Sequence, residues 1–178
     1  MELTAALSDL CKGISQPIIA IDGPAGAGKT TLASDIALSM GRFLKVHTLH
    51  MDNLYNGWLT PFDEKWRDLL NTAVTAHKAR EKYSLSHFDW KQLQYGSDVE
   101  QPRAELLILE GVGAGLSQLS REVSALIWMD IDPTLGLQRV LSRDGEEISL
   151  EMQNWLHLQE QHFLVEGAKI RADFILTT

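Results

Sequence analysis

The stretch Gly23-Pro24-Ala25-Gly26-Ala27-Gly28-Lys29-Thr30 decides the fold, because it fits the pattern G-x-x-x-x-G-K-[ST] at every fixed position. An apolar run at residues 18–21 precedes it, and residues 29–40 carry apolar side chains at helical spacing. A strand, a loop and a helix in this order build a phosphate-binding loop, whose small residues let backbone N–H groups turn inward around a phosphate. The start of the helix adds a partial positive charge at the same point.

The motif predicts a nucleoside triphosphate, ATP or GTP, together with Mg²⁺ as the ligand of this loop. Lys29 is expected to reach the β- and γ-phosphates, and the hydroxyl of Thr30 is expected to ligate Mg²⁺. The flanking strand and helix argue against a chance match of a glycine-rich turn. The residues expected to hold the nucleotide are Gly23, Ala25, Gly26, Ala27, Gly28, Lys29, Thr30 and Thr31.

The rest of the chain alternates short apolar runs with helical patterns, which indicates an α/β fold. The runs are nearly continuous rather than alternating, as in strands that a parallel sheet buries on both faces. We therefore expect a doubly wound parallel five-stranded sheet with helices on both faces, in one domain of residues 1–178. Strands are expected at 18–21, 44–49, 106–109, 125–131 and 174–176, and further helices at 62–81, 133–142 and 149–168. The segment from about 50 to 104 is long for one crossover and predicts a substrate-binding insertion.

The composition excludes several functional classes. The net charge is -8 and the pI is near 5.2, which argues against nucleic acid and against a polybasic membrane anchor. A single cysteine, Cys11, allows no intrachain disulfide, and no apolar run approaches the roughly 20 residues that span a bilayer. A soluble protein of the cytoplasm is expected. The sequence leaves the oligomeric state open, with a homodimer among the alternatives.

A second informative stretch follows the second expected strand and contains Asp52, Tyr55 and Trp58. A carboxylate at that strand end would lie beside the phosphate loop, where Asp52 could accept a proton from an attacking hydroxyl or help to hold Mg²⁺. Tyr55 and Trp58 could form a wall for a planar or sugar substrate. In the alternative reading, Asp52 caps a loop and both aromatic residues belong to the core.

Two further stretches carry charges that phosphoryl transfer uses. Glu110 ends a buried strand, where a lone carboxylate is costly unless it is paired, and Mg²⁺ is the simplest partner. Arg139 and Arg143 are four residues apart, so both lie on one helix face and could stabilise charge on a transferring phosphoryl group. The alternative is a solvated helix face with a local pair between Arg143 and Asp144.

Taken together, these stretches resemble the uridine kinase and phosphoribulokinase group of phosphate-loop kinases. The matching segments are residues 21–31, 50–55, 109–112 and 139–144. The resemblance implies the strand order 2-3-1-4-5, ATP or GTP as the donor and a hydroxyl as the acceptor. It also implies roles for six residues: Asp52 as catalytic base, Lys29 as phosphate clamp, Thr30 and Glu110 on the magnesium side, and Arg139 and Arg143 in the lid.

Three functions stay open at this point, two of them kinases. The first is a kinase acting on a hydroxyl of a small molecule, for instance a nucleoside such as uridine. The second is a nucleoside monophosphate kinase, whose anionic acceptor needs several arginines; Arg67, Arg80 and Arg103 are the only ones between residues 50 and 104. The third is a module that binds ATP without transferring phosphate. The sequence argues against a GTPase, because no aspartate has glycine three residues on and no asparagine precedes a lysine.

Overall fold

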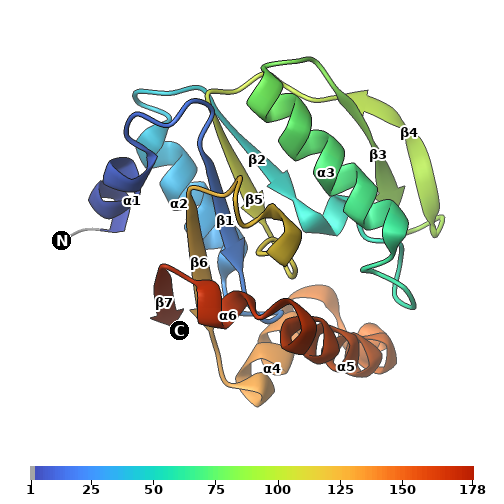
Figure 1. Ribbon diagram of the computed structural model, residues 1–178. Coiled ribbons are helices and arrows are strands. Elements are labelled where there is room, and N and C mark those ends of the chain that lie inside the picture. The colour runs from blue at the N-terminus through green and yellow to red at the C-terminus, as the bar shows by residue number, and fades with distance from the viewer. Residues whose placement is uncertain (1–2) are drawn as a thin grey trace.

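In the computed structural model, which describes residues 3–178, a central parallel sheet is flanked by helices on both faces (Figure 1). The strands of this sheet are β1 (Ile18–Asp22), β2 (Val46–His50), β5 (Leu106–Glu110), β6 (Ala125–Asp130) and β7 (Phe174–Thr177). The helices are α1 (Leu3–Cys11), α2 (Lys29–Met40), α3 (Glu64–Ala79), α4 (Pro133–Asp144), α5 (Ser149–Glu166) and the short α6 (Ala168–Arg171). No helix within residues 3–178 is long and apolar enough to cross a bilayer.

The order of the strands across the sheet is β2-β5-β1-β6-β7. Numbering these five strands along the chain gives 2-3-1-4-5, so the expected fold class and strand order are confirmed. All neighbours run parallel, and their register pairs both Ile21 of β1 and His50 of β2 with Glu110 of β5. The carboxyl ends of these three strands therefore meet at one edge of the sheet, which is where ligands of such sheets bind.

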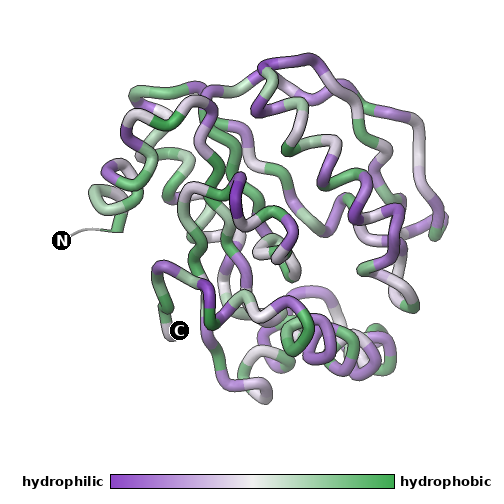
Figure 2. The backbone as a smooth tube through the Cα atoms, viewed as in Figure 1, coloured by the Kyte–Doolittle hydropathy of each residue, from purple (hydrophilic) through white to green (hydrophobic). Residues whose placement is uncertain are grey.

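The central strands are buried because alternate residues point into two separate cores. In β1, Ile19 and Ile21 pack with α1 and α2, whereas Ile18 and Ala20 pack with α3 and α5. The strands at the centre are accordingly mostly green in Figure 2, and hydrophilic residues lie mainly in the outer segments. α1 adds Leu7 to the first core, although the sequence analysis did not predict this helix.

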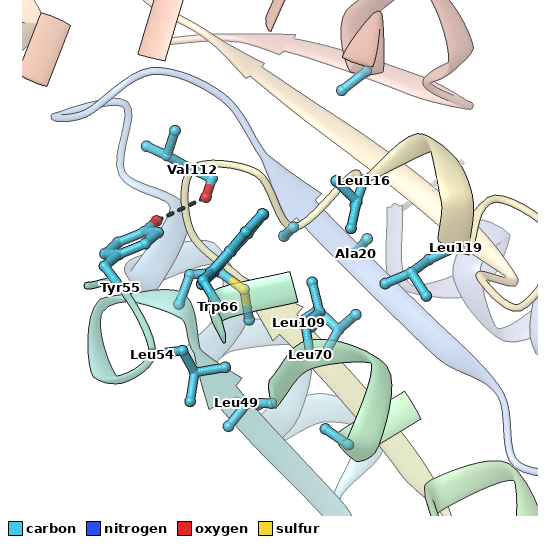
Figure 3. Packing of buried hydrophobic residues seen from close by; sticks show 14 of the residues in the cluster. Ala20, Leu49, Leu54, Tyr55, Trp66, Leu70, Leu109, Val112, Leu116 and Leu119 are labelled. Carbon is cyan, nitrogen blue, oxygen red and sulfur yellow. Dashed lines mark hydrogen bonds between the residues drawn. The ribbon is translucent and has the colours of Figure 1, made fainter. Parts of the chain in front are cut away.

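The long crossover between β2 and β5 holds the turn η1 (Met51–Asn53), α3 and an antiparallel hairpin of β3 (Ser84–Asp89) and β4 (Gln94–Glu100). α3 begins where the Asp63 carboxylate accepts a hydrogen bond from the Trp66 amide, an ordinary N-cap. Figure 3 shows Trp66 and Leu70 of α3 packed with Leu49 of β2 and Leu109 of β5. This packing fixes the insertion over one face of the sheet.

The helices near the carboxyl edge have clear ends. The Asp132 carboxylate caps α4 by accepting from the amides of Thr134 and Leu135, and Pro133 stands in its first turn. α5 begins at Ser149, as expected, and ends at Glu166 because Gly167 takes a left-handed conformation with φ 62°. In Figure 1 the strands of the sheet point toward α4 and α5.

Candidate active site

The phosphate loop, residues 23–30, needs glycine at the positions where its backbone turns. Gly23, Gly26 and Gly28 have φ values of 138°, 80° and 87°, a region that other residues rarely adopt. A Cβ atom added at Gly26 would lie 2.3 Å from the carbonyl oxygen of Gly136 in α4. The loop therefore packs against α4 so closely that only glycine fits at position 26.

The inner side of the loop presents a row of free donors. Within residues 3–178, five consecutive or nearly consecutive amides of the loop and the first turn of α2 have no hydrogen-bond acceptor; they belong to Gly26, Gly28, Lys29, Thr30 and Thr31. The first amides of a helix have no partner inside the helix, and the helix dipole adds positive charge there. This arrangement fits the phosphate chain of a nucleotide.

Two residues of the predicted nucleotide-binding set face elsewhere. A Cβ atom at Gly23 would lie 2.2 Å from the Met129 carbonyl oxygen, so this glycine serves packing against β6. Ala27 is fully buried in the core beneath α2, and its amide already donates to the Pro24 carbonyl at 3.3 Å. The remaining members of the set line the cavity described below.

Asp22, the last residue of β1, holds the loop from behind. Its carboxylate is fully buried and accepts hydrogen bonds from the amides of Gly23, Gly113 and Gly115 at 2.7, 2.8 and 2.9 Å. It thus ties the phosphate loop to the segment that follows Glu110. Asp22 lies within the matching segment 21–31, but no role was predicted for it; an acid directly before the first glycine, at the end of a buried strand, was the available signal.

Lys29 is buried, with 7% of its surface exposed, and its Nζ donates to the Pro24 carbonyl oxygen at 2.7 Å. Burial lowers the pKa of the Lys29 ammonium, and the negative charges of Asp22, Glu110 and Asp52 oppose this effect. The hydrogen bond to Pro24 holds the Lys29 ammonium at the loop, where the charges of these carboxylates favour its protonated form. It is placed to interact with the end of a bound phosphate chain.

Glu110 is held on both of its oxygen atoms. Its Oε1 accepts from the Thr30 hydroxyl at 3.0 Å, and its Oε2 lies 2.6 Å from Nδ1 of His50. The hydrogen bond to Glu110 raises the pKa of His50. The neighbouring His47 instead contacts Gln101 at 3.3 Å, so the two histidines share no site, as their spacing on a strand predicts.

Asp52 stands on η1, directly after β2, and its side chain is exposed to the cavity. Its carboxylate makes no hydrogen bond or ion pair with any described residue, whereas its main-chain oxygen accepts from the indole N–H of Trp90 at 2.8 Å. The crowding of protein atoms around it and, second, the charge of Glu110 raise the pKa of the Asp52 carboxyl, and Lys29 and Arg143 oppose the rise. The carboxylate is free to accept a proton from a ligand.

The oxygen atoms of Thr30, Asp52 and Glu110 lie along the same cavity as the phosphate loop. They are hard donors of the kind that Mg²⁺ prefers. In the described part of the chain no three His, Cys, Asp or Glu residues are grouped to hold a metal ion by themselves. This donor set fits Mg²⁺ that takes most of its ligands from phosphate oxygens and water, as it does in phosphoryl-transfer sites.

One cavity of about 670 Å³ joins these groups to an aromatic region. Ala25, Gly26, Gly28 and Lys29 line one end of it. Three indole rings, which we call the acceptor wall, line the other end: Trp58 lies 4.9 Å from Trp90 and 6.0 Å from Trp155, measured between ring centroids. Trp58 was predicted for this role, and Trp155 both lines the cavity and belongs to the buried core cluster.

Tyr55 was predicted to form part of a substrate wall, but the structure buries it. Only 1% of its surface is exposed, and its hydroxyl donates to the Val112 carbonyl oxygen at 2.7 Å (Figure 3). Burial raises its pKa well above the usual value. The ring borders the cavity, but the hydroxyl fixes the segment after Glu110 and is not free to contact a ligand.

Arg139 and Arg143 both reach the cavity from α4. Arg139 lies 3.4 Å from the Gly26 carbonyl oxygen, at the outer side of the phosphate loop. Arg143 pairs with Asp144 at 2.6 and 2.7 Å, so the local pair considered as an alternative is present. This pair is compatible with the predicted role of Arg143 in stabilising a transferring phosphoryl group, because it leaves the Arg143 side chain exposed beside the cavity.

Comparison with known proteins places this arrangement in context. No model of a protein family matches the chain, and no curated protein sequence matches it. Solved structures do match. A possible uridine kinase from Bacillus stearothermophilus has a TM-score of 0.66 at 20% sequence identity, over 99% of this chain and 100% of that one. The chain has the phosphate-loop kinase fold.

Two further structures support the same conclusion about the fold. A candidate fructose transport system kinase from Silicibacter sp. TM1040 gives a TM-score of 0.63 at 18% identity and covers 98% of both chains. D-glycerate 3-kinase from Cryptococcus neoformans gives 0.62 at 13% identity, over 87% of this chain and 82% of that chain. The resemblance found in the sequence is thus confirmed for the fold, and the three neighbours differ in the acceptor that their names indicate.

Proposed function

We propose that the protein is a kinase that transfers the γ-phosphate of ATP or GTP to a hydroxyl group of an uncharged small molecule. One observation carries the proposal: the carboxylate of Asp52 has no hydrogen-bond or ion-pair partner among residues 3–178 and opens into the same cavity as the free amides of the phosphate loop and Lys29. A proton acceptor beside a phosphate-binding loop is the arrangement that transfer to a hydroxyl requires.

In the proposed reaction, the loop amides and Lys29 hold the β- and γ-phosphates. The acceptor oxygen forms a bond to the γ-phosphorus, its proton moves to the Asp52 carboxylate, and the bond from phosphorus to the β-phosphate oxygen breaks to release the nucleoside diphosphate. Arg139 and Arg143 stabilise the charge of the transferring group from α4. Thr30 and Glu110, with Asp52 nearby, would hold Mg²⁺, which when bound would neutralise charge on the phosphates.

The cavity favours an uncharged acceptor with a planar ring, and we propose a nucleoside such as uridine. The acceptor wall offers ring faces and edges for stacking. The three arginines that a monophosphate acceptor would need do not line this cavity. Arg67 pairs with Glu166 at 3.0 Å, Arg80 donates to Ser15 at 3.1 Å, and Arg103 lines a separate cavity. These positions argue against a nucleoside monophosphate kinase.

The test is a coupled assay of ADP release with Mg-ATP over nucleosides, sugars and vitamins, with cytidine monophosphate as the anionic comparison. We expect turnover with an uncharged acceptor and a loss of at least about a hundredfold in kcat for Asp52→Asn, the usual scale of general-base catalysis. Calorimetry should show that Asp52→Asn still binds Mg-ATP. Asp98→Asn, an exposed acid on β4, is the matched control.

Full turnover of Asp52→Asn contradicts the assigned base. Turnover with cytidine monophosphate alone supports the monophosphate kinase instead. Tight binding of Mg-ATP with no turnover across the whole set supports the binding module, the third function that the sequence left open.

A further inference from the structure

A buried glutamine of α5, distant in sequence, contacts the phosphate loop. The side-chain Oε1 of Gln159 accepts a hydrogen bond from the amide of Ala25 at 3.1 Å. The two residues are 134 positions apart in the chain, and Gln159 is only 6% exposed. A buried side-chain amide needs hydrogen-bond partners, and the side-chain oxygen of Gln159 has the Ala25 amide of the loop as its donor.

The contact acts on a peptide group that also holds Lys29. The Pro24 carbonyl and the Ala25 amide belong to one planar peptide unit, whose C=O and N–H point in opposite directions. On one side, the Pro24 oxygen accepts from Nζ of Lys29 at 2.7 Å; on the other, the Ala25 N–H donates to Gln159. Gln159 therefore fixes the orientation of the peptide that receives Lys29.

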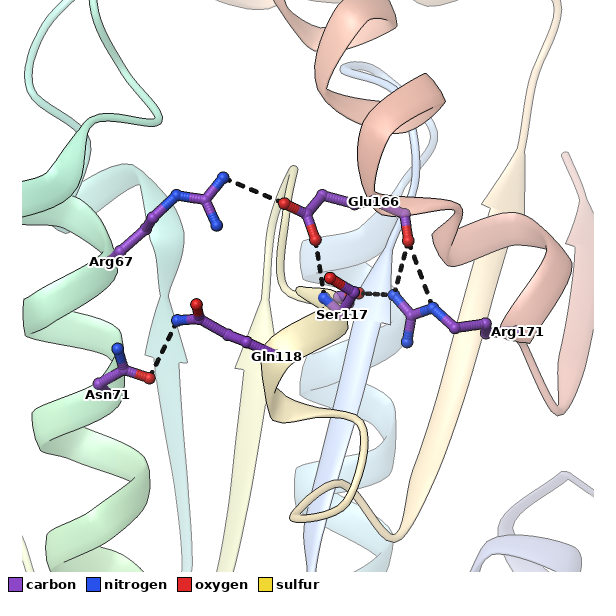
Figure 4. Close-up of polar contacts among 7 residues, drawn as sticks. Arg67, Asn71, Ser117, Gln118, Glu166 and Arg171 are labelled. Atoms are coloured by element: carbon purple, nitrogen blue, oxygen red, sulfur yellow. Dashed lines mark hydrogen bonds and ion pairs between the residues drawn. The ribbon is translucent and has the colours of Figure 1, made fainter.

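α5 is anchored firmly enough to position this side chain. At its C-terminal end, the Glu166 carboxylate accepts from Arg67 of α3 at 3.0 Å and from the Ser117 amide at 2.8 Å, and Arg171 donates to the Glu166 carbonyl oxygen (Figure 4). One turn earlier, His162 stacks on Phe62 with ring centroids 4.3 Å apart. These contacts tie α5 to the insertion and to the segment after β5.

The same face of α5 also lines the acceptor end of the cavity. Met152, Trp155 and Gln159 are all buried and follow each other at spacings of three and four residues, which puts them on one side of the helix. Met152 and Trp155 border the cavity beside the acceptor wall. A single helix face thus contributes to both ends of the site.

We propose that Gln159 is a positioning residue of the phosphate loop: it holds the Pro24–Ala25 peptide and thereby keeps Lys29 and the free amides arranged for a triphosphate. Its side chain acts through the loop. The effect on nucleotide binding rests on the proposed function, whereas the effect on the Ala25 amide does not. The two effects can therefore be tested separately.

The experiment compares wild type with Gln159→Met, which keeps the length and removes the acceptor oxygen, and with Gln159→Glu, which keeps an acceptor. Gln153→Met, at an exposed position of the same helix, is the control. NMR hydrogen exchange of the Ala25 amide is measured in the ligand-free proteins, and calorimetry then measures the Kd for Mg-ATP and Mg-GTP. Thermal unfolding shows that each variant is folded.

In Gln159→Met we expect the Ala25 amide to exchange at least about tenfold faster and the Kd for the preferred nucleotide to rise about three- to tenfold, the scale of one lost hydrogen bond. In Gln159→Glu the amide should stay protected, while like charge near the phosphates weakens binding. Unchanged exchange in folded Gln159→Met overturns the inference, and so does an unchanged Kd. Wild type that binds neither nucleotide overturns the proposed function, whatever the exchange shows.

Discussion

Asp22 offers a sharp test of how the site is built. Replacing its carboxylate leaves main-chain amides without an acceptor in a region that water does not reach, since Asp22 is fully buried. Each orphaned buried donor costs about 1–3 kcal/mol. The carboxylate is also the first of the charges that support the ammonium of Lys29, so its loss affects the phosphate loop as well as the fold.

The structure predicts which of two Asp22 substitutions lowers the free energy of unfolding more. In Asp22→Asn one oxygen becomes an NH₂ group, so at least one of the three amide hydrogen bonds is replaced by a donor facing a donor, a loss of about 1–3 kcal/mol. In Asp22→Ala all three amides lose their acceptor, which should cost about 3 kcal/mol at the least. Domains of this size are stabilised by only about 5–15 kcal/mol, so the alanine variant should lose a large share of the total stability.

The assay is unfolding in guanidinium chloride at pH 7.5, followed by tryptophan fluorescence. Asp35→Asn is the control, because Asp35 is exposed on α2, the helix that follows the loop, and its substitution removes the same charge. We expect a free energy of unfolding that falls in the order wild type, Asp22→Asn, Asp22→Ala. Equal stability of wild type and Asp22→Asn would refute the reasoning, because it would mean that the carboxylate does not hold the segment after Glu110.

Two further outcomes follow from burial and from the acceptor wall. Burial lowers the pKa of His162 from 6.5 to about 4, so the unfolded chain takes up the proton first and stability is lost as the pH falls from 6.5 toward 4. By pH 5 the loss should be about 2 kcal/mol relative to pH 7.5, and guanidinium unfolding of His162→Phe at the two pH values should show a correspondingly flatter dependence. An identical pH dependence in this variant would contradict the assignment; His157→Phe, on the exposed side of α5, is the control. Trp58→Ala should raise the KM of the acceptor found in the screen at least about tenfold, roughly 1.4 kcal/mol of binding, and leave the Kd for Mg-ATP unchanged. A change confined to Mg-ATP binding would place Trp58 at the wrong end of the cavity.

The parts of the fold that local sequence encodes could be predicted closely. The apolar run at 18–21 and the pattern at 29–40 correspond to β1 and α2 almost residue for residue. The hairpin of β3 and β4 could not be predicted in this way, because β4 is almost entirely exposed and its sequence shows no apolar alternation. β2 begins at Val46 rather than at 44, as an edge strand whose residues are mostly half-buried.

The candidate site likewise has residues that the sequence predicts and contacts that it does not. Lys29, Thr30, Asp52 and Glu110 follow strand ends or belong to a fixed motif, so topology alone predicts that they gather in one place. The contacts that hold them do not have local signatures. The bonds from Gly113 to Asp22, from His50 to Glu110 and from Ala25 to Gln159 join residues 91, 60 and 134 positions apart. Only the folded chain reveals them.

The central claim is that the free amides at the tip of β1 bind the phosphate chain of a nucleotide. The most direct measurement is a titration with Mg-ATP, and in parallel with Mg-GTP, followed by the amide NMR signals of the ligand-free protein. We predict that one nucleotide produces its largest shifts, together with slower hydrogen exchange, at the amides of Gly26, Gly28, Lys29, Thr30 and Thr31. Saturating nucleotide that leaves these five signals unmoved, or that shifts only signals elsewhere, would contradict the claim.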